Sequence, residues 1–260
     1  MIFRSQLAVH ESRGELRPAF EAIAQVQQSA GVSDWYVTQP DHCRISAELA
    51  AAFDSRKVPR LDEAVVRAIA LHDVGWMPYD GDITSPQAPF KLESGVAVSF
   101  ANTEPETFLP AWMGSIQAAQ STGPLGGLMV SAHFARLTHP YLDSGKGTPE
   151  QRAQVEGFLL REAARVERLL PQAGLPVEEI ETLIAVLQFC DLASLYFCAN
   201  PEDPVELPQV LNGSRVQFRF EDGAFRMRPN LLDHVLVLEI PCVRFVDGKA
   251  EREMVPVKVQ

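Results

Sequence analysis

The longest apolar stretch of the chain, residues 177–200, limits the fold more than any other feature of the sequence. Ile180, Leu187 and Asp191 fall on one face at helical spacing, so a carboxylate occupies a position that faces the core. Burying an unpaired carboxylate costs several kcal/mol unless a cation or hydrogen bonds compensate for it. The fold must therefore bring a partner for Asp191 from another part of the chain.

The hydrophobic pattern changes near residue 200. Before this point, apolar residues recur at helical spacing, and short apolar runs at residues 1–4 and 35–38 are typical of strands. Beyond about residue 205 apolar and polar residues alternate, which indicates β-hairpins. We therefore predict a mainly α protein. An all-helical body formed by residues 1–200 would carry a small antiparallel β appendage at residues 205–260, packed on it and a candidate partner for the short N-terminal strands.

Composition and charge limit the partners of the chain. Its 260 residues, 46% of them hydrophobic, are enough for one sizeable core. A formal net charge of −11 disfavours general binding to nucleic acids. No signal peptide is recognisable at the N-terminus, and Gln188 and Asp191 interrupt the longest apolar stretch, so we expect a cytoplasmic protein without a membrane partner. The four cysteines form no Cys-x-x-Cys pair, and we expect neither disulfides nor a thiolate zinc site.

Two further segments place metal-capable side chains on apolar faces. His42 follows Asp41, a candidate N-cap, in the first turn of a predicted helix. In residues 61–76, an apolar stripe ends at His72, and Asp73 comes next. We expect this helix to end just after the pair, with a glycine in the left-handed conformation at position 75.

His42, His72, Asp73 and Asp191 together form a donor set of two imidazoles and two carboxylates. Mixed nitrogen and oxygen donors suit a divalent transition metal (Mn, Fe, Co, Ni or Zn) better than Ca. The alternative is a purely structural network, in which these side chains hydrogen-bond to one another in the core. Stoichiometric metal in the purified protein distinguishes the two interpretations.

The order of these residues resembles that of the HD-domain superfamily of metal-dependent phosphohydrolases, over roughly residues 36–200. The resemblance rests on residues 39–42 (Gln-Pro-Asp-His), 72–76 (His-Asp-Val-Gly-Trp) and 190–198, and it is greatest for an uncharacterised bacterial branch with a His-Asp-x-Gly-Trp motif. It implies an HD-domain-like helical bundle and a metal ion bound by His42, His72, Asp73 and Asp191, with a coordinated water that attacks phosphorus. Related cyclic-dinucleotide phosphodiesterases carry Lys where this chain has Trp76, which argues against their substrate.

Five more residues are candidates for the site. His133 is either an additional or second-metal ligand or general acid, or a helix histidine packed near the core. Arg136 and Lys91 offer cations for a phosphate, although a plain surface position suits each of them better when taken alone. Trp76 and Tyr79 would stack on a base or sugar, or wall the cavity.

Taken together, these features predict a metal-dependent hydrolase acting on a small phosphorylated substrate, a nucleotide or a phosphate ester, with Asp73 and His133 as catalytic residues. Two alternatives stay open. One is a non-catalytic, metal-bound domain that senses a ligand or regulates a partner, with the β appendage as a partner surface or homo-oligomer contact. The other is a di-iron oxygenase of HD type in which His133 is essential.

Overall fold

The computed structural model describes residues 1–28, 35–80, 98–246 and 249–260. Helices account for 53% of the described residues and strands for 21%. The α-helices of the described residues are α1 (Ala19–Gln28), α2 (Gln39–Ala51), α3 (Glu63–Ala70), α4 (Met77–Asp80), α5 (Pro105–Gln120), α6 (Pro124–Asp143), α7 (Pro149–Leu169) and α8 (Val177–Ala199). Three short 3-10 helices lie between them, namely η1 (Val74–Trp76), η2 (Phe100–Asn102) and η3 (Leu170–Gln172).

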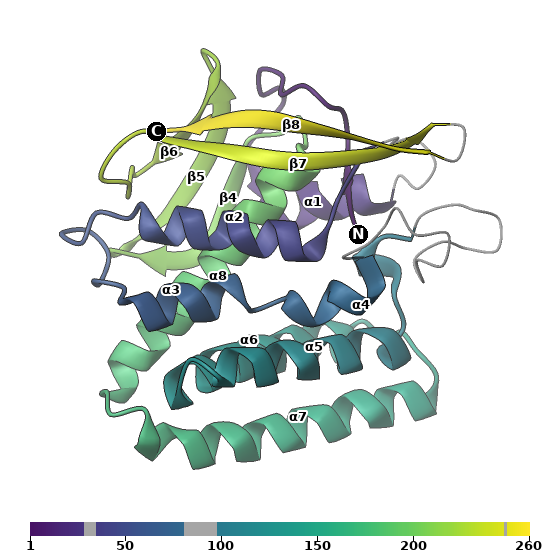
Figure 1. Cartoon of the computed structure of the whole chain (residues 1–260), viewed down its shortest axis with the longest axis vertical. Coiled ribbons are helices and arrows are strands. Elements are labelled where there is room, and N and C mark those ends of the chain that lie inside the picture. Colours follow the sequence, from purple (N-terminus) through teal and green to yellow (C-terminus); the bar gives the residue numbers. More distant parts are fainter. Residues whose placement is uncertain (29–34, 81–97, 247–248) are drawn as a thin grey trace.

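The strands of the described residues form one mixed sheet of eight strands in the order β1-β3-β7-β8-β6-β5-β4-β2. Their bounds are β1 (Ile2–Arg4), β2 (Arg17–Pro18), β3 (Trp35–Val37), β4 (Val205–Leu211), β5 (Ser214–Glu221), β6 (Ala224–Arg228), β7 (Leu236–Val246) and β8 (Lys249–Val259). The sheet curls into a half-barrel above the helices (Figure 1). β2 pairs with β4, and β6 with β8, in parallel, whereas the other pairs are antiparallel.

This sheet contradicts the predicted fold class. The expectation of an all-helical, HD-domain-like bundle with a small C-terminal β appendage is wrong, because strands from both ends of the chain build one large sheet. β3 joins β1 to β7, and β2 pairs with β4, so the N-terminal strands β1 and β2 form the two edges. These N-terminal strands are only two or three residues long. β1 and β3 lie within the apolar runs that the sequence marked as strands, whereas β2 has no such signal and is defined only by its pairing with β4.

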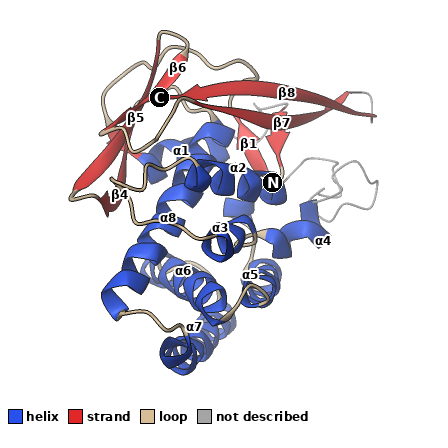
Figure 2. Cartoon of the chain, turned by 60° about the vertical axis from the view of Figure 1, so that its left-hand side comes forward, coloured by secondary structure: helices blue, strands red, loops and turns tan. Residues whose placement is uncertain are grey.

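Helix α8 links the sheet to the helical layers (Figures 1 and 2). It packs against α1, α2 and α6 as well as β1 and β4. Its aromatic side chains Tyr196 and Phe197 contact Phe218 and Phe225 of the sheet. Within the described part of the chain, α8 is the one helix long and apolar enough to cross a membrane, and 78% of that apolar window is buried inside the fold. Burial on all sides is typical of the core helix of a globular domain.

Local capping signals explain where several helices begin and end. α7 begins with a capping box, in which Thr148 and Gln151 each accept a backbone hydrogen bond from the other. α2 is capped by Thr38, whose Oγ1 accepts from the backbone N–H of Asp41 at 3.1 Å, so Asp41 is not the N-cap that the sequence suggested. α8 ends at Asn200, which adopts the left-handed conformation with φ of 53°.

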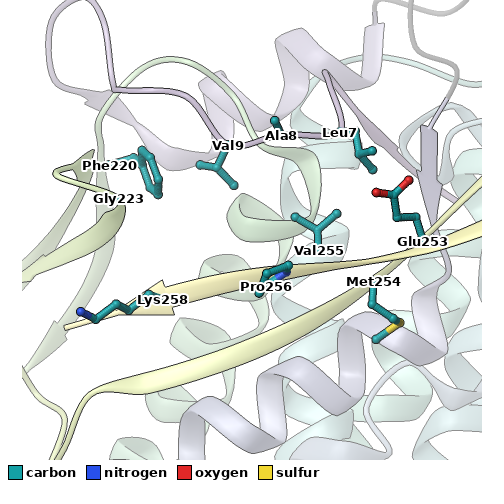
Figure 3. A pocket seen from close by; sticks show the side chains of 10 residues that line it. All are labelled: Leu7, Ala8, Val9, Phe220, Gly223, Glu253, Met254, Val255, Pro256 and Lys258. Carbon is teal, nitrogen blue, oxygen red and sulfur yellow. The ribbon is translucent and has the colours of Figure 1, made fainter.

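The sheet opens between β8 and β6. β8 pairs with β7 along its whole length, but it meets β6 only at Val259, opposite Phe225. Beside this opening lies a cavity of about 330 Å³ between β8 and the N-terminal segment of residues 7–9. In Figure 3 the side chains of Val9 and Val255 face the cavity from its two sides. Among the described residues, no metal-capable group of side chains lies there.

Candidate metal centre

Four buried donors converge between the helices. His42 comes from α2, His72 and Asp73 come from the turn between α3 and η1, and Asp191 comes from α8. One donor atom from each lies within 4.8 Å of the others, and all four residues are buried. The structure therefore brings together the four residues that the sequence singled out as metal ligands, and the group could hold a metal ion.

The turn that carries His72 and Asp73 is fixed by a close approach to α5. α3 ends before these two residues, and Gly75 belongs to η1 rather than to a left-handed helix end, so that part of the prediction is wrong. A Cβ on Gly75 would lie 1.9 Å from the carbonyl oxygen of Ala111 and 2.7 Å from the backbone nitrogen of Ser115. Only glycine permits this contact.

The hydrogen bonds of His72 determine which ring nitrogen faces the centre. Nδ1 lies 2.7 Å from the carbonyl oxygen of Ile69, which can only accept, so Nδ1 carries a proton and donates it. Nε2 faces Oδ1 of Asp191 at 3.3 Å and Oδ2 of Asp73 at 3.8 Å. A ring nitrogen between two carboxylates must either hold a second proton or share a cation with them.

His42 is held in the same way. Its Nδ1 lies 2.6 Å from Oγ of Ser194, and that hydroxyl donates its single proton to the carbonyl oxygen of Asp191 at 2.8 Å. Ser194 therefore accepts from Nδ1–H. Nε2 of His42 is left 3.3 Å from Oδ2 of Asp73 and 3.5 Å from Oδ1 of Asp191. Both imidazoles thus direct Nε2 at the same two carboxylates.

The pKa shifts at the centre agree with two imidazoles that face two ionised carboxylates. Burial alone would raise the pKa of Asp191, but the hydrogen bond from His72 and the charges of the three nearby histidines outweigh it and lower that pKa to about 2. Burial opposes charge on His72, yet the pKa of His72 is raised well above its usual value by Cys43, Asp191 and Asp73. Without an ion, the second proton on His72 balances the carboxylates, and a metal ion would displace that proton.

The donor spacing fits a divalent ion. Metal bonds of about 2.0–2.2 Å place neighbouring ligand atoms roughly 3.0–3.5 Å apart, close to the separations of 3.3–3.8 Å between the imidazole nitrogens and carboxylate oxygens. Cys43 also lies next to the two histidines. Burial raises the pKa of its thiol, which accepts the backbone N–H of Asp73 at 3.1 Å. Cys43 therefore packs beside the centre and holds the backbone of Asp73 in place.

Two other predicted residues lie beside the centre. His133 on α6 places Nε2 3.7 Å from Oδ2 of Asp191, and its buried Nδ1 has no hydrogen-bond partner among the described residues. Burial lowers the pKa of His133 to about 4. Trp76 is buried, and its Nε1–H donates to Oδ1 of Asp73 at 3.1 Å. Trp76 therefore orients a candidate ligand.

Arg136 and Tyr79 contact residues other than the four candidate ligands. Arg136 forms an ion pair with Glu181 on α8, and its Nη1 donates to Oε1 of Gln188 at 3.1 Å. Tyr79 packs edge-on against Trp76 with ring centroids 5.8 Å apart. Lys91 lies outside the described residues. Of the two predicted phosphate-binding cations, only Arg136 lies among the described residues, and it pairs with α8.

An aromatic cavity adjoins the centre, and among its lining residues the sequence had suggested Trp76 and His133 beside two of the candidate ligands. Its volume is about 260 Å³, and Asp73, His133 and Asp191 contribute to its wall. The rest of the wall is mostly apolar, including Phe100, Phe108, Trp112, Phe134 and Leu195. Phe108 and Trp112 are four residues apart on α5, and this i, i+4 aromatic spacing was the available signal. Ser194, three residues after Asp191, was not predicted.

One protein-family model matches residues 26–244, and its description is "Protein of unknown function (DUF3891)". The match covers most of the helical layers, all four candidate ligands and the strands β3 to β6. No curated protein matches the chain, and no solved structure does.

Proposed function

The chain belongs to the DUF3891 family of proteins of unknown function, and we propose that it is a metal-dependent hydrolase of small phosphate esters. One observation carries the proposal: two imidazoles and two carboxylates converge in a buried centre that adjoins a small cavity. The order of these four residues is also the order of the ligands in HD-domain phosphohydrolases, which supports the same reaction class.

The proposed ion is Mn, Fe, Co, Ni or Zn, bound by His42, His72, Asp73 and Asp191. When bound, such an ion supplies a water of lowered pKa and polarises a phosphoryl oxygen. The protein contributes the orientation of the ligands. Both histidines donate from Nδ1 to a fixed oxygen, and this directs Nε2 at the centre, where it would bind the ion in place of a proton.

Asp73 and His133 have separate roles in the proposed reaction. Oδ1 of Asp73 is held by Trp76, so its carboxylate is fixed and its other oxygen faces the centre. Asp73 thus orients the attacking water. His133 lines the cavity, and the lowered pKa keeps its ring neutral near pH 7. Its unpaired Nδ1 is available to hydrogen-bond a substrate oxygen.

The test is hydrolysis of a panel of nucleotides and aryl phosphates by protein loaded with Mn or Co. His72→Gln and Asp191→Asn each remove one donor, and we expect turnover to fall by at least about 100-fold, since even an indirect partner of a ligand is worth about 10–100-fold. His139→Gln is the matched control, because His139 is exposed on α6. Turnover that survives Asp191→Asn would rule out this mechanism.

A di-iron oxygenase is the second candidate. The third histidine favours it, because Nε2 of His133 lies 3.7 Å from Oδ2 of Asp191 and adds a donor on the far side of that carboxylate. Iron analysis after anaerobic purification separates the two candidates. Two irons per chain, together with oxygen consumption, would favour the oxygenase, and a single ion with phosphatase activity would favour the hydrolase.

A further inference from the structure

The cavity beside the metal centre has a rigid aromatic wall. Phe108 and Trp112 on α5 lie with ring centroids 4.5 Å apart, and Trp112 stacks on Phe134 of α6 at 4.9 Å with an interplanar angle of 16°. Leu195 lines the same cavity from α8, one helical turn after the candidate ligand Asp191. Flat side chains that already pack on one another offer a preformed surface for a flat apolar group.

The size and charge of the cavity narrow the choice of ligand. An apolar cavity of about 150 Å³ is known to hold benzene, and the volume here is about 260 Å³. One or two fused rings would therefore fill it. Among the described residues that line it there is no lysine or arginine, whereas Asp73 and Asp191 are carboxylates. A polyphosphate chain would find no positive side chain among these residues, so we place the charged end of a ligand at the ion.

Three polar atoms of the wall lack partners. Oε1 of Gln39, Nδ1 of His133 and the hydroxyl oxygen of Tyr141 are buried, form no hydrogen bond within the described part of the protein, and belong to residues that line the cavity. Gln39 and His133 are each 1% exposed. Buried polar atoms in native proteins are normally paired. A ligand with an oxygen or hydroxyl group beside its ring would pair with them.

We infer that this cavity binds the aromatic part of the substrate, and that the substrate class is phosphate monoesters of aromatic alcohols. The phosphate half of this inference rests on the proposed function. The ring-binding half rests only on the cavity wall and can be tested without metal or turnover.

The experiment measures binding of 1-naphthol, the alcohol that hydrolysis of 1-naphthyl phosphate releases, to metal-free protein by calorimetry. We expect one binding site per chain and no heat with glycerol. Leu195→Phe fills part of the cavity and should weaken binding by about tenfold or more. Leu192→Phe is the matched control, since Leu192 is partly buried on the same helix and does not line the cavity. Leu137→Trp, at an exposed position of the wall, gives the same test if Leu195→Phe does not fold.

A second arm measures hydrolysis of 1-naphthyl phosphate and glycerol 2-phosphate by Mn-loaded protein. We expect kcat/KM to favour the naphthyl ester by about tenfold or more, and Leu195→Phe to reduce that preference. Naphthol binding without hydrolysis of either ester would support the aromatic binding site and contradict the proposed hydrolase function. Hydrolysis without naphthol binding, or equal weakening by Leu195→Phe and Leu192→Phe, would overturn the aromatic site.

Discussion

Replacing Gly75 by alanine should destabilise the protein strongly, because the new methyl group has no space. Its Cβ would lie 1.9 Å from the carbonyl oxygen of Ala111 and 2.7 Å from the backbone nitrogen of Ser115. Carbon atoms normally approach other heavy atoms to about 3.5 Å, so η1 and α5 would have to separate by more than about 1 Å. Overpacking usually costs about 1–3 kcal/mol, and a clash with helix backbone belongs at the upper end, at about 3 kcal/mol.

Gly114→Ala is the matched control for this change. Gly114 faces Gly75 from α5, but its added Cβ would meet only the Cα of Gly75, at 3.3 Å. Alanine also favours a helix over glycine by about 1 kcal/mol, which offsets the tight contact. In urea unfolding with a slope of about 3 kcal/mol/M, we expect Gly75→Ala to lower the midpoint by about 1 M and Gly114→Ala to change it little. Equal midpoints for the two variants would refute the claim that this contact fixes the turn.

Two further predictions follow from single residues. Ser194→Ala removes the oxygen that accepts from Nδ1 of His42, so affinity for the metal, measured by competition with a chelator, should fall by about 10–100-fold; unchanged affinity would contradict the assigned tautomer. Asp54 accepts three hydrogen bonds from Arg56, which hold the pKa of Asp54 below its usual value. The contribution of this carboxylate to stability is present above the unfolded pKa of about 3.9 and is lost as the pH falls below it. The stability gap between the wild type and Asp54→Asn should therefore shrink below about pH 4, and a gap independent of pH would speak against this pairing.

The candidate metal ligands could be predicted from the sequence because each was identified from its near neighbours in the chain. His42, His72 and Asp191 each occupy an apolar face at helical spacing, and a buried carboxylate needs a partner. The same reasoning failed at the end of α3. The apolar stripe continues to His72, but the packing of Gly75 on α5 ends the helix earlier than the stripe suggests.

The full extent of the sheet was not accessible in the same way. The sequence marked β1 and β3 as short strands, but tertiary contacts define β2 and join all eight described strands into one sheet. Arg4 in β1 is fully buried, and its guanidinium donates to the carbonyl oxygens of Phe197 and Cys198 at the end of α8. Nothing near Arg4 in the sequence marks it as buried. β2 consists of Arg17 and Pro18 alone, and it is a strand only because it lies parallel to β4. The aromatic cavity likewise joins side chains of α5, α6 and α8 that the sequence keeps far apart.

The central claim is that His42, His72, Asp73 and Asp191 bind one metal ion. An anomalous-scattering map from crystals of protein purified without chelators tests it most directly. The account predicts one strong peak at the absorption edge of a transition metal, about 2.0–2.2 Å from Nε2 of both histidines and from an oxygen of each carboxylate. A map with no peak among these four side chains, from protein that was given the metal in excess, would contradict it.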